Sequence, residues 1–382
     1  MTKAGLLLRL RRPLGTAWPN AEQGRVLQAI FAPPPDALAA FHAWRDNVDL
    51  EGDVDGGVFR LLPLLYLRLS AMGVDDPLMR RLKGVYRRAW SDTHALFHAT
   101  APALQALHAA GIETLLLKGA PMVLLCYRQH GARPMADLDI AVRQRDLDAA
   151  LHALAAAGWI PDAPIGEAER RFRHARTFRG PTGQEIDLHW HMLFESGSDA
   201  ADAPFWANRE PLAFQGIPTT ALAPSLELVH VLAHGLRPNR ESPIRWVADA
   251  LTLLRAQGAT VDWAQVAGVA AQLGLSRRIA VGLRYLRDQH GQDIPEATLR
   301  ALDDAPFSLA ERLELAVVAP RLPRLHVAAL DRLAMLVAEF WRIRRADPAR
   351  PLLGTTRRYI GYRTGWRLRG GVLPWPGQQR PG

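Results

Sequence analysis

The chain has almost no cysteine: Cys126 is the single thiol among 382 residues. One thiol cannot form a disulfide within the chain, and it cannot supply a cysteine-rich zinc site. We therefore expect ordinary hydrophobic cores, and the length suggests two or three domains. A single cysteine also fits a reducing compartment.

Long apolar runs are missing as well. The run over 61–67 is far too short to cross a bilayer, and Arg60 and Arg68 bracket it. Within residues 6–12 the arginines follow the leucines, which is the reverse of the order in a secretory signal. We therefore expect no transmembrane segment and a cytoplasmic protein.

Most of the chain has no excess of positive or of negative charge. Residues 341–382 hold ten arginines and one aspartate, so this stretch alone accounts for the formal net charge of +9. The balanced remainder argues against a general nucleic-acid-binding body. In the tail, arginines alternate with Tyr359, Tyr362 and Trp366. This pattern favours an anionic partner, either nucleic acid or a membrane surface, with a solvated or self-packed extension as the alternative.

The hydrophobic pattern divides the chain into four parts. We expect a mainly helical region over 1–100 and an α/β core over 101–222. A second helical region over 223–345 and a basic, partly disordered tail over 346–382 follow.

Short apolar runs and helical periodicity alternate within the expected core. The expected strands are 112–117, 138–142, 172–178 and 185–191. The expected helices of the core are 120–129 and 146–157. Turn residues over 181–183 predict a hairpin of the last two strands. Residues 77–110 read as two helices, and the helices after the core are expected over 226–236, 244–254, 263–273, 277–289, 309–318 and 327–343.

Three carboxylates stand out in the core. Asp137 and Asp139 are two residues apart on an expected strand, so both point to one face. Asp187 lies in a later strand, on the face opposite to its apolar neighbours. Carboxylates that converge at strand ends suit Mg²⁺ or Mn²⁺. Two such ions can activate an attacking hydroxyl and stabilise the leaving oxygens of an in-line displacement.

A phosphate-binding turn is expected just before these carboxylates. Lys118 and Gly119 close the first strand and open a helix, where a glycine permits close approach and the helix start favours negative charge. Arg133, four residues before Asp137, is placed to reach a phosphate as well. The alternative for Arg133 is a structural ion pair with Asp137 or Asp139.

Several histidines lie near this constellation in the sequence. His189 and His191 share the face of Asp187 by strand parity, so they either contact phosphate and acceptor or are core histidines. His234 lies on an expected helix, where a packing role is the alternative. Asp249 is four residues after Arg245, a spacing that also allows an ion pair.

Taken together, these motifs resemble the polymerase-β-like nucleotidyltransferases, and more narrowly a bacterial group of that superfamily whose substrates are mostly unassigned. The resemblance runs from about residue 61 to about residue 254, and it includes His234, Trp246 and Asp249. Three stretches carry it: Leu117-Lys118-Gly119, Gly131-x-Arg133-x-x-x-Asp137-x-Asp139 and Glu185-Ile186-Asp187-Leu188-His189-Trp190-His191.

The resemblance implies a small mixed sheet flanked by mainly helical regions. It implies transfer of a nucleoside monophosphate from an NTP to an acceptor, with release of pyrophosphate and two divalent ions as cofactors. The implied metal ligands are Asp137, Asp139 and Asp187, with the catalytic metal on Asp187. The triphosphate would be faced by Lys118, Gly119 and Arg133. Further acceptor or phosphate contacts would be His189, His191, His234 and Asp249.

One departure keeps two alternatives open. Gly119 is followed by Ala120, where the superfamily usually has a serine whose hydroxyl touches the triphosphate. This departure favours a weak or inactive binding or scaffold protein of the same fold. A glycosyltransferase that uses Asp-x-Asp is the other alternative, although little nucleotide-binding α/β region precedes Asp137. The acceptor stays open among a peptide, a small metabolite, a sugar and a protein.

Overall fold

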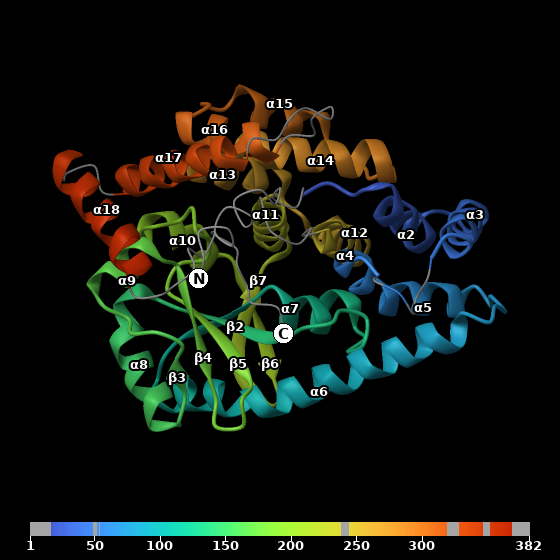
Figure 1. Cartoon of the computed structure of the whole chain (residues 1–382), viewed down its shortest axis with the longest axis horizontal. Coiled ribbons are helices and arrows are strands. Elements are labelled where there is room, and N and C mark those ends of the chain that lie inside the picture. The colour runs from blue at the N-terminus through green and yellow to red at the C-terminus, as the bar shows by residue number, and fades with distance from the viewer. Residues whose placement is uncertain are drawn as a thin grey trace.

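The computed structural model describes residues 17–48, 52, 54–237, 244–318, 328–346 and 352–368. Helices surround one seven-stranded mixed sheet, which confirms the predicted α/β class (Figure 1). None of the helices within these ranges is long and apolar enough to cross a membrane. Residues 6–12, on which the signal-peptide prediction rests, lie outside the described part of the chain.

The sheet has the strand order β3-β4-β5-β2-β1-β7-β6. Its strands are β1 (Thr114–Leu117), β2 (Asp137–Val142), β3 (Ile160–Pro161), β4 (Ala175–Arg179), β5 (Glu185–His189), β6 (Arg209–Phe214) and β7 (Ile217–Leu222). β2 pairs in parallel with β5 and antiparallel with β1, and β1 pairs in parallel with β7. The predicted hairpin is confirmed as the antiparallel pair β4–β5.

The structure adds a second hairpin, β6–β7, which the hydrophobic pattern did not predict. Pro211 and Pro218 interrupt this stretch and weaken its strand signal. β6 is an edge strand, where a residue without an N–H is tolerated. Pro218 pairs with Ala213 of β6 and lies outside the register that β7 shares with β1.

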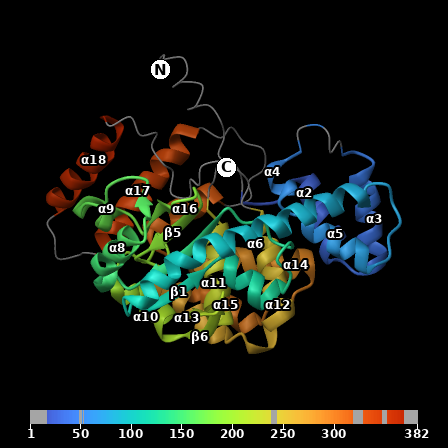
Figure 2. The ribbon, with the colours of Figure 1, turned by 90° about the horizontal axis from the view of Figure 1, so that it is seen from below.

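One face of the sheet is covered by the helix α6 (Met79–Ala109), which crosses it together with α8 (Leu147–Ala156) (Figure 2). The prediction of two helices over 77–110 is wrong, because α6 is continuous and Pro102 lies inside it. Buried residues line one side of α6 both before and after Pro102, so packing on the sheet overrides the local cost of the proline.

The segment after β1 also differs from the prediction of a helix over 120–129. A three-residue turn of α-helix, α7 (Gly119–Pro121), leads into a π-helix over Met122–Tyr127. Such π-helical turns are rare and frequently lie at functional sites.

Among the described residues four helices precede α6, within the stretch predicted to be mainly helical: α2 (Ala21–Phe31), α3 (Pro34–Arg45), α4 (Gly56–Phe59) and α5 (Leu62–Ala71). α2 begins with a capping box, in which Asn20 and Gln23 each bond to the other's backbone N–H. α3 begins at Pro34, a first-turn position that tolerates proline.

The remaining helices lie around and beyond the sheet. They are α9 (Glu167–Phe172), α10 (Asp199–Ala207), α11 (Pro224–Gly235), α12 (Arg245–Gln257), α13 (Trp263–Leu273), α14 (Ser276–His290), α15 (Glu296–Asp304), α16 (Leu309–Val318), α17 (Ala328–Ala346) and α18 (Leu352–Leu368). Every helix predicted after residue 223 is present, and α9, α10, α15 and α18 are additional to the predicted helices.

Two hydrophobic cores lie on opposite faces of the sheet. Leu116 and Ile140 belong to the core under α6 and α8. Leu115 and Leu117 point the other way, into a larger core that includes α11, α12 and the N-terminal helices. β1 is therefore buried on both faces, and the acidic residues of β2 and β5 lie on the face away from α6.

The described part of the tail forms α18. Tyr359 and Tyr362 pack against Phe172 of α9, with ring centroids 6.0 and 5.0 Å away. Arg173 Nε donates a hydrogen bond to the Tyr362 hydroxyl at 3.0 Å. These two aromatic side chains thus make contacts within the chain. The side chain of Trp366 and residues 369–382 lie outside what the structure describes.

Candidate functional site

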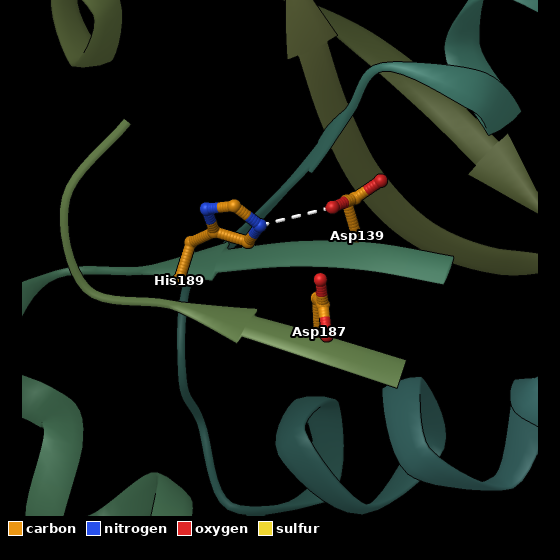
Figure 3. Close-up of side chains that lie close together, drawn as sticks. All are labelled: Asp139, Asp187 and His189. Carbon is orange, nitrogen blue, oxygen red and sulfur yellow. Dashed lines mark hydrogen bonds and ion pairs between the residues drawn. The ribbon is translucent and has the colours of Figure 1, made fainter. Parts of the chain in front are cut away.

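The register of two parallel strands brings the site together. β2 and β5 pair Asp139 with Asp187, and Ala141 with His189. Alternate residues of a strand share a face, so both aspartates and His189 point away from the core under α6. Figure 3 shows the three side chains on the same side of the two strands.

Asp139, Asp187 and His189 form a group that could hold a metal ion. One ligand atom from each lies within 4.8 Å of the others, and no other such group occurs among the described residues. His189 Nε2 lies 2.9 Å from Asp139 Oδ1 (Figure 3). The Thr177 hydroxyl donates to Asp187 Oδ1 at 2.6 Å. Two carboxylates and an imidazole are a donor set that divalent cations accept, so the residues fit a metal.

Asp137 lies on the same strand face, but it is not one of the three residues in this group. Its register partner on β5 is Glu185. Burial, followed by the charges of Asp139 and Asp187, raises the pKa of Asp137 to about 7. Its role as a metal ligand therefore stays a prediction.

Lys118 provides a positive charge next to Asp139. Its ammonium lies 2.5 Å from Asp139 Oδ1, and the side chain is 13 % exposed. Burial alone would raise the pKa of Asp139, but Lys118 and then His189 hold it well below its ordinary value. The carboxylate of Asp139 is therefore ionised and fixed from two sides.

Gly119 follows at the start of α7. Neighbouring side chains fill the space that a side chain at this position would occupy. A Cβ added there would collide with the thioether of Met135 and would lie 2.8 Å from Arg133 Nη1. The structure thus places Arg133 beside the Lys118–Gly119 turn, and a phosphate-binding role for this turn stays a prediction.

Arg133 forms a buried ion pair, and its partner is Asp249 rather than Asp137 or Asp139. Its Nε and Nη2 donate to the two oxygens of Asp249, both at 2.9 Å. The Tyr127 hydroxyl donates to the same carboxylate at 2.9 Å. Arg245, the partner considered for Asp249, donates to the Pro134 carbonyl at 2.8 Å. Arg133 is thus held rigidly, with Nη1 next to Gly119.

The other predicted histidines are not members of the metal-binding group. His191 Nδ1 lies 2.6 Å from Asp202 of α10, whose other oxygen accepts from the Met192 N–H. His234 stacks on His230, with the ring centroids 6.3 Å apart. Burial, followed by the charge of Lys118, holds the pKa of His234 well below its ordinary value. A structural role for His191 agrees with the core alternative.

Two residues near the site were not predicted. Thr177 orients Asp187 from the neighbouring strand β4, and only the register reveals this contact. Glu227 on α11 is buried, and neither carboxylate oxygen has a hydrogen-bond partner among the described residues. Burial, followed by the charge of Asp249, raises the pKa of Glu227 to about 8. Glu227 is the single acid of α11, and this was the available signal in the sequence.

Comparisons with known proteins show what the chain is similar to. A solved structure described as an antigenic nucleotidyltransferase-like protein from Paracoccidioides brasiliensis is similar at 16 % identity and a TM-score of 0.34. That match covers 56 % of this chain and 95 % of the other. No curated protein matches. The family model described as uncharacterised nucleotidyltransferase matches residues 58–289, which is more than half of the chain. The chain therefore belongs to this nucleotidyltransferase family.

Proposed function

We propose that the chain is a metal-dependent nucleotidyltransferase that moves a nucleoside monophosphate from an NTP to an acceptor and releases pyrophosphate. The observation that supports this most is the register pair Asp139–Asp187 with His189, next to the Lys118–Gly119 turn. Family membership supplies the class of reaction.

The proposed cofactor is Mg²⁺ or Mn²⁺, held by Asp139, Asp187 and His189, with Asp137 as a further carboxylate. When bound, such an ion neutralises phosphate charge and lowers the pKa of an acceptor hydroxyl. The residues are oriented in advance, because Thr177 fixes Asp187 and Lys118 fixes Asp139. Preorganised ligands need little rearrangement when the ion arrives.

Lys118, Gly119 and Arg133 are the proposed contacts of the triphosphate. Asp249 holds two nitrogens of Arg133, so that Nη1 is the nitrogen left for a phosphate oxygen beside Gly119. A guanidinium fixed in this way would orient the chain of phosphates without losing its own side-chain freedom on binding.

The acceptor remains open among a peptide, a small metabolite, a sugar and a protein. The structure assigns His191 and Asp249 to partners within the chain, which leaves His234 as the less constrained of the proposed acceptor contacts. Arg357 and Arg358 are exposed on α18, and an anionic partner for them stays part of the proposal.

A second candidate is a binding or scaffold protein that keeps the fold without turnover. Lys118 favours it, since an ammonium among the carboxylates lets them stay buried without a metal. Ala120 favours it too, because it offers no hydroxyl to the triphosphate. The glycosyltransferase alternative gains nothing from the family match.

Calorimetric binding of all four NTPs, with and without Mg²⁺ or Mn²⁺, tests the proposal. The wild type should bind at least one NTP in a metal-dependent way, and Asp187→Asn should lose this binding. Glu185→Gln is the matched control, because Glu185 lies two residues away on the same strand face and pairs with Arg179. Binding that survives in Asp187→Asn, or its absence for every NTP, would contradict the proposal.

A further inference from the structure

We propose that the Lys118 ammonium takes the place of one of the two metal ions, so that the site holds a single divalent cation. This inference rests on the proposed function and deepens it. It concerns how the charge of the carboxylates is balanced, and it differs from the expectation of two ions.

The first support is the position of the ammonium. Lys118 Nζ lies 2.5 Å from Asp139 Oδ1. Asp187 is the register partner of Asp139 on β5, and Asp137 lies two residues from Asp139 on the same strand face, so the ammonium lies beside the carboxylates of β2 and β5. A cation bound to a carboxylate of this group occupies the kind of position that a metal ion takes in such sites.

The second support is the backbone of Lys118, which fixes the side chain there. Its φ of 55° and ψ of −108° lie outside the regions that side-chain-bearing residues normally adopt. The other non-glycine residue with positive φ near the site, Arg128, has a ψ of 24° and lies in the ordinary left-handed region. A strained conformation persists only where its surroundings enforce it, and it is concentrated at functional sites. The ammonium is therefore built into the cluster.

The third support is the choice of residue. Only three of the 47 basic side chains are lysines, and the rest are arginines. Buried ion pairs elsewhere use arginine, as at Arg133–Asp249 and Arg342–Glu314. An ammonium is a compact point charge, whereas a guanidinium is a planar fork. Only the ammonium can fit where a metal ion would otherwise lie between carboxylates.

The charge balance points the same way. When all three carboxylates are ionised, Lys118 offsets one of them, and one divalent cation offsets the other two. A second divalent cation would leave the cluster with an excess of positive charge. The described residues also provide a single group of ligands, Asp139, Asp187 and His189, which suits one ion.

The test is the number of Mn²⁺ ions bound per chain, measured by the paramagnetic resonance signal of free Mn²⁺ during a titration. The wild type should bind one ion. Lys118→Met, which keeps an unbranched side chain of nearly the same length but removes its charge, should bind two. Lys83→Met is the control, because Lys83 is an exposed lysine that is also followed by a glycine. It should bind one.

Two ions in the wild type, or one ion in Lys118→Met, would overturn the inference and leave the proposed function standing. No Mn²⁺ bound to any of the three proteins would overturn both. Thermal unfolding in EDTA and in Mn²⁺ adds an independent measurement. Lys118→Met should gain more in melting temperature from Mn²⁺ than Lys83→Met does, and an equal gain would contradict the inference. The wild-type stoichiometry decides the question even if Lys118→Met folds poorly.

Discussion

Arg133 and Asp249 form a bidentate ion pair between residues 116 positions apart, and it joins the segment before β2 to α12. Both side chains are buried, and the Tyr127 hydroxyl shares the carboxylate. The pair therefore links the site to the helical region that follows the sheet.

Breaking this pair from one side should be costly. Asp249→Asn leaves the Arg133 guanidinium buried without a counter-charge, and we expect a loss of about 3–5 kcal/mol in the free energy of unfolding. Urea unfolding followed by tryptophan fluorescence measures it. Asp92→Asn is the control, since Asp92 pairs with Arg88 at the surface and should cost less than about 1 kcal/mol. Equal losses in the two variants would contradict this account.

His189 and His191 are two residues apart, yet the structure gives them different tasks. His189 belongs to the metal-binding group, whereas His191 pairs with Asp202. His189→Ala should weaken Mn²⁺ binding at least about tenfold, as removal of groups around a metal typically does. His191→Ala should lower the melting temperature and leave Mn²⁺ affinity unchanged. A Mn²⁺ titration of both variants checks this. An equal loss of Mn²⁺ affinity in the two variants would contradict the separate roles of the two histidines.

Glu227 should make stability depend on pH. The folded chain raises the pKa of this group from 4.5 to about 8, so it binds the proton more tightly than the unfolded chain does. Stability should therefore fall as the pH rises from about 4.5 to about 8, and this loss should then level off.

Glu227→Gln keeps the neutral shape and removes that fall. Its stability relative to the wild type should increase by a few kcal/mol between about pH 5 and about pH 8.5, as measured by urea unfolding. Glu210→Gln, at an exposed position on β6, should show no such trend. A difference between Glu227→Gln and the wild type that is constant with pH would refute the buried, protonated state.

Cys126 should be an inert thiol. Burial, followed by the charge of Glu227, raises its pKa to about 12, and only the thiolate reacts. Alkylation by iodoacetamide at neutral pH should be roughly a thousandfold slower than for a free thiol. Since Cys126 is the single cysteine, the rate can be assigned directly, and urea should restore it. A native rate equal to the unfolded rate would contradict the burial.

Strands β1, β2 and β5 could be predicted because short apolar runs between turn residues indicate buried strands. The Asp-x-Asp pair and Asp187 were visible for the same reason, since strand parity places them on one face. The register of β2 with β5 was not visible, because strand pairing depends on contacts between distant segments. For this reason the sequence grouped Asp137 with the two other aspartates, whereas the structure groups His189 with them.

Other differences have local causes. The prolines of β6 and β7 hid a hairpin that the sheet edge tolerates. Pro102 suggested a break between two helices, but α6 continues through it because the helix packs on the sheet. The partner of Arg133 was predicted from nearby residues, but a side chain of this length reaches α12, far away in the sequence.

The most direct test of the central claim is the anomalous scattering of Mn²⁺ in a crystal of this chain. We predict one peak within bonding distance of Asp139, Asp187 and His189, and its loss in Asp187→Asn. No peak at these three side chains under saturating Mn²⁺, or a peak that persists in Asp187→Asn, would contradict the metal site and the function proposed from it.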